Sequence, residues 1–368
     1  MFPVINHIND VLGFIEDKDE FSVRDKGEYQ VIDYAVSKED TFDSPEAREC
    51  RGIKFWNDGS IAFRPFHKFF NHGERKDLEE QYFNEDFRMF EKIDGSLLHF
   101  LPVNGELRAM TKGGITDVSE QAERELSRMV EDIDVFKKVY ERFYSMGYCI
   151  MFEYTSPINR IVIRHDKPSL TLIGVRDIHT GEYHPLDMFA EHLRVPKAQE
   201  FDPNDLHQVK EWKDKEGVVL VWKSGYSLKV KADDYVLKHK TKDQLNQEKN
   251  VLQFVLDDSV DDLAGILDED DFIAVKRFAE DVEKNITDFV GSMNLLRETR
   301  KEWYGDDRKA HALDIKNQSK LIQIIYWKMF GGQDAEEAVR SVVKKNLTSQ
   351  TKVDGIREII AVRWEDYV

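Results

Sequence analysis

Short apolar runs recur through the first two thirds of the chain, and turn-forming residues separate them. Their lengths and their β-branched and aromatic content predict strands. The predicted strands cover residues 51–56, 60–66, 89–101, 107–111, 149–154, 160–164, 170–175, 217–222 and 226–230. Residues 118–144 have helical spacing instead, with Leu126, Met129 and Val130 as a plausible buried stripe. We therefore expect a mixed α/β domain over residues 1–243.

The pattern changes after residue 243. Glycine and proline become scarce from Leu245 onward, and apolar residues recur at helical spacing. Two apolar stripes stand out, namely Phe272, Val275, Phe278 and Val282, and then Leu321, Ile324, Ile325 and Met329. We expect a separate all-helical domain over residues 244–368.

Composition narrows the class of protein. With 53 Lys+Arg against 71 Asp+Glu, the formal net charge is −18, which argues against a protein that coats nucleic acid with its whole surface but allows a local basic groove. Cys50 and Cys149 lack metal-ligand spacing, which disfavours a disulfide scaffold or a zinc site and favours a reducing compartment. The first residues do not resemble a leader, and no run of about 18 apolar residues could cross a membrane. We expect a cytoplasmic protein with no membrane partner.

The main chemical signal is Lys92-Ile93-Asp94-Gly95-Ser96. A lysine between two strands and before an Asp-Gly turn is held by rigid elements yet exposed at a loop. On its own the string is weak, because it also describes a hairpin turn with a solvated lysine. It predicts a lysine nucleophile only together with other residues.

Further acids and bases follow in a definite order. Glu153 lies in a predicted strand, and Glu216-Gly217 opens another. Lys229 and Lys231 alternate along a third strand, so they share one face. Two like charges on one face are tolerated where an anion, such as a triphosphate, lies between them. Taken singly, each of these residues also fits an ordinary solvated strand.

The order K-x-D-G, strand acid, E-G and K-x-K resembles the covalent nucleotidyltransferase superfamily. Within it, the sequence is similar to the single-stranded RNA ligases of the T-even bacteriophages. The matching segments lie at residues 49–53, 64–71, 92–96, 157–162, 175–183, 229–236 and 259–263. The resemblance implies an α+β fold: an N-terminal nucleotidyltransferase domain with ATP-grasp-like antiparallel sheets and helices, followed by an all-α C-terminal domain.

The implied activity is ATP-dependent RNA ligation, in which Lys92 carries AMP, passes it to an RNA 5′-phosphate, and a 3′-hydroxyl then displaces it. ATP and Mg²⁺, or Mn²⁺, are the implied cofactors. The implied partner is single-stranded RNA ends, with a nicked tRNA anticodon loop as the family expectation and the helical domain contributing tRNA specificity. The resemblance further implies a monomer, in the cytoplasm of an infected host if the gene belongs to a phage.

The resemblance also carries residue roles. Lys92 is the implied nucleophile, and Lys229, Lys231 and Glu216 are the other implied catalytic residues. The implied nucleotide contacts are Tyr34, Arg51, Lys68, Phe70, Gly95, Lys112, Glu153, Glu216, Lys229 and Lys231. The implied metal ligands are Glu153, Glu216, Asp261 and Asp262. For the last two, the sequence alone favours a solvated surface, because residues 257–271 hold eight acids and no bases.

Two departures and three alternatives remain at this point. Superfamily members often stack the adenine on an aromatic residue where this chain has Val175, and Gly113-Gly114 replaces Gly-Ser. A DNA ligase or a capping guanylyltransferase would normally continue into a β-barrel after the K-x-K strand, whereas helical spacing follows here. A non-catalytic RNA-binding protein would be favoured had Lys92, Glu216 or the paired lysines been lost.

The window 223–242, with six lysines and two acids, is the expected cationic surface for RNA.

Overall fold

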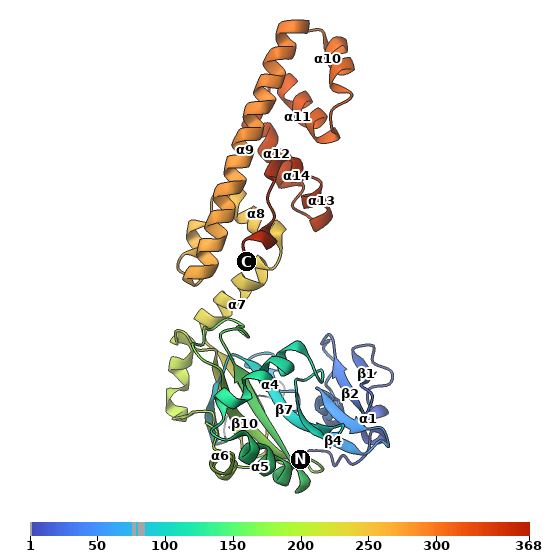
Figure 1. The fold of residues 1–368 in the computed structure, drawn as a ribbon, viewed down its shortest axis with the longest axis vertical. Coiled ribbons are helices and arrows are strands. Elements are labelled where there is room, and N and C mark those ends of the chain that lie inside the picture. The colour runs from blue at the N-terminus through green and yellow to red at the C-terminus, as the bar shows by residue number, and fades with distance from the viewer. Residues whose placement is uncertain (1, 76–78, 80–84) are drawn as a thin grey trace. The chain divides into compact units, whose positions relative to one another are not determined.

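The computed structural model describes residues 2–75, 79 and 85–368, and the chain divides into two units, Met1–Val236 and Leu237–Val368 (Figure 1). The division falls inside helix α7 (Asp233–Leu245). The boundary that we expected from the sequence, after residue 243, lies near the end of the same helix. Each unit has hydrophobic clusters of its own.

The described residues of the first unit form three β-sheets, in which every pair of strands is antiparallel except β13 with β5. One sheet has the order β1 (Phe21–Asp25), β2 (Tyr29–Tyr34), β3 (Ile53–Trp56) and β4 (Ile61–Phe63). A second has the order β10 (Ser169–Asp177), β9 (Tyr148–Thr155), β7 (Ser96–Val103) and β8 (Glu106–Met110). The third has the order β11 (Glu200–Phe201), β6 (Phe87–Lys92), β12 (Gly217–Trp222), β13 (Ser227–Lys231) and β5 (Phe70–Asn71).

The helices of this unit pack on the sheets. They are α1 (Asn9–Leu12), α2 (Pro45–Glu49), α4 (Asp117–Met129), α5 (Ile133–Ser145), α6 (Asp187–Leu193) and the 3₁₀ segment η1 (Pro203–Glu211). The single helix predicted over 118–144 is two helices, because Val130 has extended backbone and the Asp132 carboxylate accepts the amides of Asp134 and Val135 to begin a new helix. α4 packs on β8 and α5 on β9.

Two strand predictions need correction. The apolar run 89–101 is interrupted after Lys92, where the chain turns between β6 and β7. Residues 160–164 are a loop, because the amides of Val162 and Ile163 donate to the Asp94 carboxylate at 2.8 and 2.6 Å and not to a neighbouring strand. Most other runs lie close to the observed strands, and the run 217–222 coincides with β12.

The central strand of the third sheet has two different faces. Val218 and Leu220 are buried in a core with Met89, Leu228 and Val230. The alternate residues of β12 face the other way, which follows from the two-residue period of a strand. The fold therefore places a core on one side of this sheet and leaves the other side for the cavity described below.

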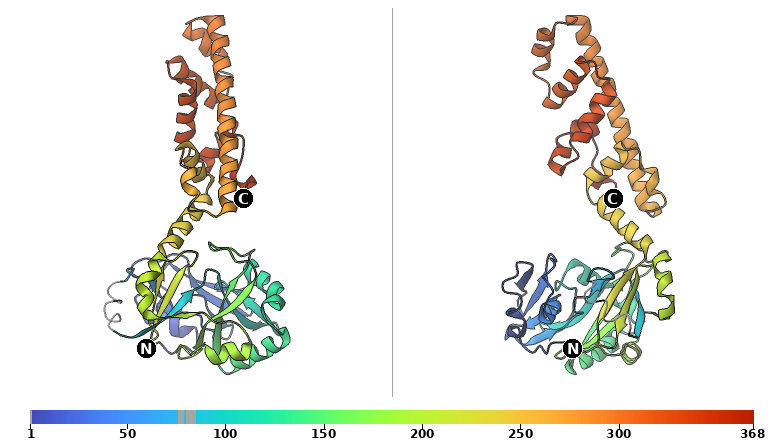
Figure 2. Two further views of the ribbon diagram at one scale, coloured as in Figure 1. Left: turned by 90° about the vertical axis from the view of Figure 1, so that its left-hand side faces the viewer. Right: turned by 180° about the vertical axis from the view of Figure 1, so that it is seen from behind.

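Within the described part of the chain, the second unit contains only helices. They are α8 (Glu248–Leu256), η2 (Asp261–Leu263), α9 (Glu269–Tyr304), α10 (Arg308–Ile315), α11 (Lys320–Phe330), α12 (Ala335–Lys345), α13 (Gln350–Asp354), α14 (Arg357–Ile360) and η3 (Trp364–Asp366). The 36-residue α9 is the long helix along which α11, α12 and α14 pack (Figure 2). Val275, Phe278 and Val282 of the first predicted stripe are buried, whereas Ile324 of the second is 52% exposed. None of the described helices is long and apolar enough to span a membrane.

Candidate active site

The register of the third sheet brings the nucleophile candidate and the paired lysines together. Lys92 of β6 and Lys231 of β13 both pair with Gly217 in the strand between them. The Glu216 carboxylate, 4% exposed, accepts from Lys92 Nζ at 2.7 Å and lies 3.0 Å from Lys231 Nζ. One carboxylate therefore bridges two ammonium groups that are far apart in the sequence.

Gly217 makes this arrangement possible. Its φ of +139° lies in the region that favours glycine, and a Cβ there would lie 2.1 Å from the Val230 carbonyl oxygen. Any side chain at this position would push β12 and β13 apart. The E-G pair of the sequence thus reflects an acid followed by a required glycine.

Lys229 is a partly buried cation without an acidic partner among the described residues. It pairs across the sheet with Val219, and its Nζ lies 4.7 Å from the centre of the Phe69 ring. The pKa of Lys229 is lowered to about 7, mainly by burial and then by the charges of four neighbours, namely Arg51, Lys92, Lys68 and Lys231. The positive charge concentrated here exceeds what Glu216 can balance.

Glu153 approaches the same place from β9, in the second sheet. Burial raises the pKa of Glu153 to about 8, with Lys92 opposing the shift and Glu216 and Asp94 adding to it. The carboxyl group makes no hydrogen bond or ion pair with any residue that the structure describes. It is an acid that lacks a partner, at a position where a hydroxyl group or a cation could supply one.

The Asp-Gly pair after the nucleophile has structural contacts. Asp94 is 3% exposed and also accepts from the Tyr235 hydroxyl at 2.7 Å, besides the two loop amides described above. A Cβ on Gly95 would lie 2.4 Å from the Tyr154 carbonyl oxygen, so glycine is needed where β7 begins beside β9. Gly95 also lines the cavity.

A second cationic group consists of Lys68 and Lys112, whose amines both lie over the Tyr34 ring. Lys68 Nζ lies 4.9–5.3 Å from the centres of the Tyr34, Phe42 and Phe70 rings, a cation–π environment. Lys112 Nζ lies 4.7 Å from the Tyr34 ring and 3.1 Å from Asp33 Oδ2. Phe70, which we expected near the adenine, is buried beneath Lys68, and its neighbour Phe69 lines the cavity.

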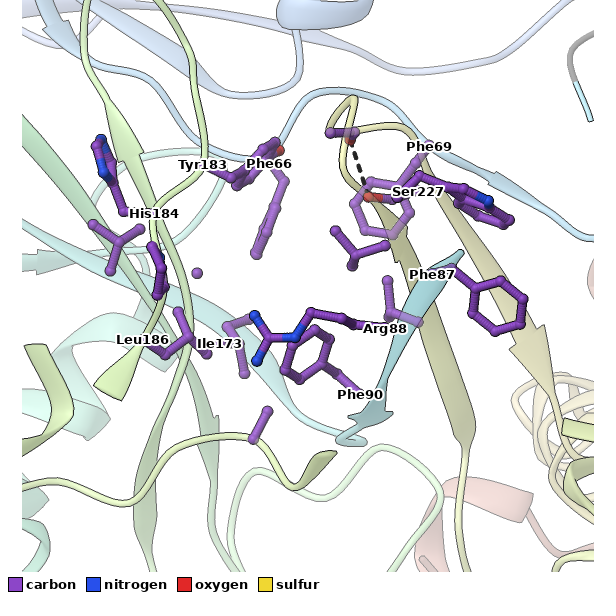
Figure 3. Close-up of a pocket in the computed structure, with 18 of the residues that line it drawn as sticks. Phe66, Phe69, Phe87, Arg88, Phe90, Ile173, Tyr183, His184, Leu186 and Ser227 are labelled. Carbon is purple, nitrogen blue, oxygen red and sulfur yellow. Dashed lines mark hydrogen bonds between the residues drawn. The ribbon is translucent and has the colours of Figure 1, made fainter. Parts of the chain in front are cut away.

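A cavity of about 1030 Å³ opens beside Lys92 between the second and third sheets. Arg51, Lys92, Glu153 and Lys229 line its polar part. Figure 3 shows Phe66, Phe90 and Ile173 around one space within the apolar part. Val175 also lines the cavity. The aromatic side chains of the cavity wall come from other segments, for example Phe66 and Phe90.

Phe66 reaches the cavity because Gly174 has no side chain. A Cβ on Gly174 would lie 2.4 Å from Phe66 Cζ, and β10 has an irregular register at this point. The Phe66 ring stacks at 5.8 Å on Tyr183, which also lines the cavity. This contact could not be predicted from the sequence, because Phe66 and Gly174 lie in segments that are far apart in the chain.

A buried ion cluster supports this wall of the cavity. Glu49 accepts from Arg64 Nε at 3.1 Å and from Arg176 Nη1 and Nη2 at 2.9 Å each. Burial raises the pKa of Glu49, but the guanidinium groups of Arg176 and Arg64 outweigh it and hold the pKa at about 2. Arg176 also donates to the Pro65 and Gly181 carbonyls, next to Phe66 and close to Tyr183. Glu49 belongs to the segment 49–53 that resembles the family, and its contacts give it a structural role: it holds Arg64 and Arg176 in place.

The predicted acidic metal pair lies in the other unit. Asp261 and Asp262 are in η2, which belongs to Leu237–Val368. Across residues 2–75, 79 and 85–368, the structure has no group of three or more His, Cys, Asp or Glu side chains placed to hold a metal ion. Metal binding by Asp261, Asp262, Glu153 or Glu216 remains a prediction.

The first unit thus has a lysine-containing cavity between two mainly antiparallel sheets, and helices follow it in the chain. A sequence profile of the RNA ligase family matches residues 49–245, more than half of the chain, and the chain belongs to that family. The matched segment contains every predicted site residue of the first unit except Tyr34.

The chain is also similar to individual proteins and to solved structures. A protein of Thermovibrio ammonificans, provisionally named an RNA ligase, is 35% identical over 171 residues, which are 46% of this chain and 44% of that protein. RNA ligase 1 of bacteriophage TS2126 is 26% identical over 317 residues, 79% of this chain and 77% of its own. An archaeal ATP-dependent RNA ligase is 14% identical with a TM-score of 0.46, covering 73% of this chain and 74% of that one. This chain spans less than half of the length of the Thermovibrio relative.

Proposed function

We propose that this protein is an ATP-dependent RNA ligase that joins RNA 5′-phosphate and 3′-hydroxyl ends through a lysyl-AMP on Lys92. The observation that carries the proposal is the position of Lys92. Its amine lies at the polar part of an aromatic cavity, beside Lys229 and Arg51, two cations that have no acidic partner among the described residues. Such a site favours a ligand with an aromatic group at one end and several negative charges at the other.

The reaction has three steps. The neutral Lys92 amine attacks the α-phosphorus of ATP, an N–P bond forms, the bond to the bridging oxygen breaks, and pyrophosphate leaves. An oxygen of the RNA 5′-phosphate then attacks the same phosphorus and releases the lysine. Finally, the RNA 3′-hydroxyl attacks the activated 5′-phosphate, loses its proton and displaces AMP.

The cations stabilise charge in these steps. Lys229 and Arg51 face the phosphates, and Lys231 joins them when it releases Glu216. Glu216 holds Lys92 in position and is the nearest group to accept its proton. Lys68 and Lys112, which lie over the Tyr34 ring, extend the same positive region. Gly95 lies beside the nucleotide, and Phe70 acts on it through Lys68, which it supports from beneath.

Glu153 is the group that best fits a divalent cation or a ribose hydroxyl. Its carboxyl is buried and without a partner, whereas both oxygens of Glu216 are already engaged by lysines. Mg²⁺ or Mn²⁺ held there would neutralise phosphate charge. Asp261 and Asp262, in the helical unit, are proposed as a separate metal-binding pair outside the catalytic pocket.

RNA is the proposed partner, and repair of a broken tRNA anticodon loop is the proposed role. The family match and the relatives named RNA ligase support RNA as the substrate class. The basic window 223–242 supports contact with phosphates, and the helical unit is the proposed source of tRNA specificity. We also propose that the protein acts as a monomer in the cytoplasm, which is that of an infected bacterial host if the gene belongs to a phage.

One experiment tests the proposal. The full chain is mixed with Mg²⁺ and ATP labelled at the α-phosphate, and label is expected on the protein and then on 5′-phosphorylated RNA. Lys92→Ala is expected to abolish the adduct, while Met146→Ser, an exposed position in the same unit, is expected to leave it unchanged. A missing adduct, or an adduct that survives Lys92→Ala, would refute the proposed ligase activity through Lys92. Labelling by GTP in place of ATP would indicate a capping activity.

A further inference from the structure

The loop at residues 156–167, here called the nucleophile-side loop, exposes apolar side chains beside Lys92. Ile158 is 74% exposed and Ile161 is 40% exposed. Neither belongs to the hydrophobic clusters found among the described residues. The nucleotide chemistry proposed above gives these two side chains no role.

The loop is fixed to the turn that carries the nucleophile. Asp94 Oδ2 accepts from the amides of Val162 and Ile163, and the Asp94 carbonyl oxygen lies 3.0 Å from His165 Nε2. Asn159 Nδ2 donates to Ser96 Oγ at 3.0 Å. Because these contacts hold the loop on both sides of Ile161, its exposed side chains are presented in one arrangement before any partner binds, which lowers the entropic cost of binding.

The loop is also basic, in contrast to the chain as a whole. Between residues 157 and 167 there are three basic residues, Arg160, Arg164 and Lys167, and one acid, Asp166. The whole chain has a formal net charge of −18. Exposed apolar side chains next to basic ones suit a single-stranded nucleic acid, whose bases offer apolar faces and whose backbone is anionic.

We propose that the nucleophile-side loop binds the RNA strand that brings the 5′-phosphate to Lys92. Ile158 and Ile161 pack against the terminal bases, and Lys167 and the two arginines lie near the backbone phosphates. The inference rests on the proposed function, because a 5′-phosphate that takes AMP from Lys92 must come within bonding distance of it. The strand attached to that phosphate then has to leave the site past a loop that is tied to residues 94 and 96.

The test separates the nucleotide step from the RNA step. In the double variant I158S/I161S, formation of the labelled lysyl-AMP from ATP and Mg²⁺ is expected at the wild-type rate. Transfer of the label to a 5′-phosphorylated single-stranded RNA oligonucleotide is expected to slow about ten-fold, the scale of losing one or two base contacts. Since both side chains are exposed, the fold should be unaffected. Met146→Ser, at 58% exposure, is the matched control for both rates.

A second variant tests the charge. Lys167→Glu is expected to weaken transfer to RNA and to reduce its salt dependence, again with normal adduct formation. Wild-type transfer rates in I158S/I161S would overturn the proposal while leaving the proposed function intact. A parallel loss of adduct formation would also overturn it, because the loop would then serve the nucleotide step. Absence of an adduct in the wild-type protein would remove both.

Discussion

At the scale of single residues, the candidate site holds more positive charge than its own acids neutralise. Both oxygens of Glu216 are used by Lys92 and Lys231. Lys229 and Arg51 are left without an acidic partner among the residues that the structure describes. A poorly solvated charge without a partner lowers the stability of the folded protein when no ligand is bound. The same charge favours the binding of an anion.

This leads to a prediction for Lys229→Met. Burial and the neighbouring cations hold the pKa of Lys229 at about 7, below its value in the unfolded chain. The unfolded state therefore binds more protons, and the contribution of Lys229 to stability becomes less unfavourable as the pH rises from 7 to about 10. Without ATP, the variant should be more stable than the wild type at pH 7, and this advantage should shrink at pH 9.5.

Chemical denaturation at the two pH values measures this difference. The same variant should form lysyl-AMP about a hundred-fold more slowly, because it lacks a cation that faces the phosphates. Exposed Lys223→Met, close in the sequence, is the control for general effects of charge removal. A variant that is less stable than the wild type at pH 7 would contradict the account of Lys229 as an uncompensated cation.

At this scale, many residues of the candidate site could be predicted from the sequence, but the contacts that hold them in place could not. The order of short motifs led to Lys92, Glu153, Glu216, Lys229 and Lys231, because chemistry restricts which residue types can serve. The contacts of Asp94 could not be predicted, since its partners lie 68, 69 and 141 residues away. Glu49 was noticed only as part of a matching string, because its arginine partners become neighbours only in the folded chain.

At the scale of elements, prediction succeeded where a strand has a clear pattern. β12 is an uninterrupted apolar run, and β13 alternates, so both were recognised. Residues 160–164 have the composition of a strand, yet a buried carboxylate takes up two of their amides. Val130 and Asp132 divide a segment whose apolar spacing reads as one helix. In both cases, hydrogen bonds from backbone amides to a carboxylate, that of Asp94 or Asp132, produced a structure that differs from the one the hydrophobic pattern predicts.

The contact between Phe66 and Gly174 gives a prediction at this scale. Gly174→Ala would place a Cβ in the space of the Phe66 ring and push the ring out of line. Under the proposed function, G174A and F66L should each raise the KM for ATP about ten-fold, the scale of one lost base–aromatic contact. The double variant should be no worse than F66L alone, because both substitutions act through the same ring.

Inorganic triphosphate provides the control for this cycle. It occupies the cationic part of the site without a base, so its inhibition of adduct formation should be the same in G174A, F66L and the wild type. Thermal unfolding checks that the variants remain folded. Strictly additive effects on KM, or an equal loss of triphosphate inhibition, would mean that Phe66 does not contact the base.

At the scale of the whole molecule, the proposed function requires an acidic protein to bind an acidic polymer. The formal net charge of −18 repels RNA at long range, and attraction is limited to segments such as residues 223–242. Binding through few phosphates favours release of the joined product. The sequence predicted this uneven charge, whereas the ion cluster that joins Glu49, Arg64 and Arg176 needed the fold.

Salt dependence measures how many phosphates are contacted. With about three contacts to single-stranded RNA, affinity should fall by roughly ten- to twenty-fold between 50 and 200 mM salt. Fluorescence anisotropy with a labelled single-stranded RNA gives the slope, and an uncharged polymer of similar length is the control. Affinity that is independent of salt would contradict binding through the basic segments.

The pairing of Lys92 and Lys231 with the same glycine has a consequence for how such sequences can vary. A strand alternates faces at each residue, so one inserted or deleted residue at the beginning of β12 would turn Glu216 away from both amines. The protein would still fold around its core and would lose its chemistry. A change in the length of a surface loop would leave this register intact, whereas a change in the number of residues within these three strands would separate Glu216 from its two lysines.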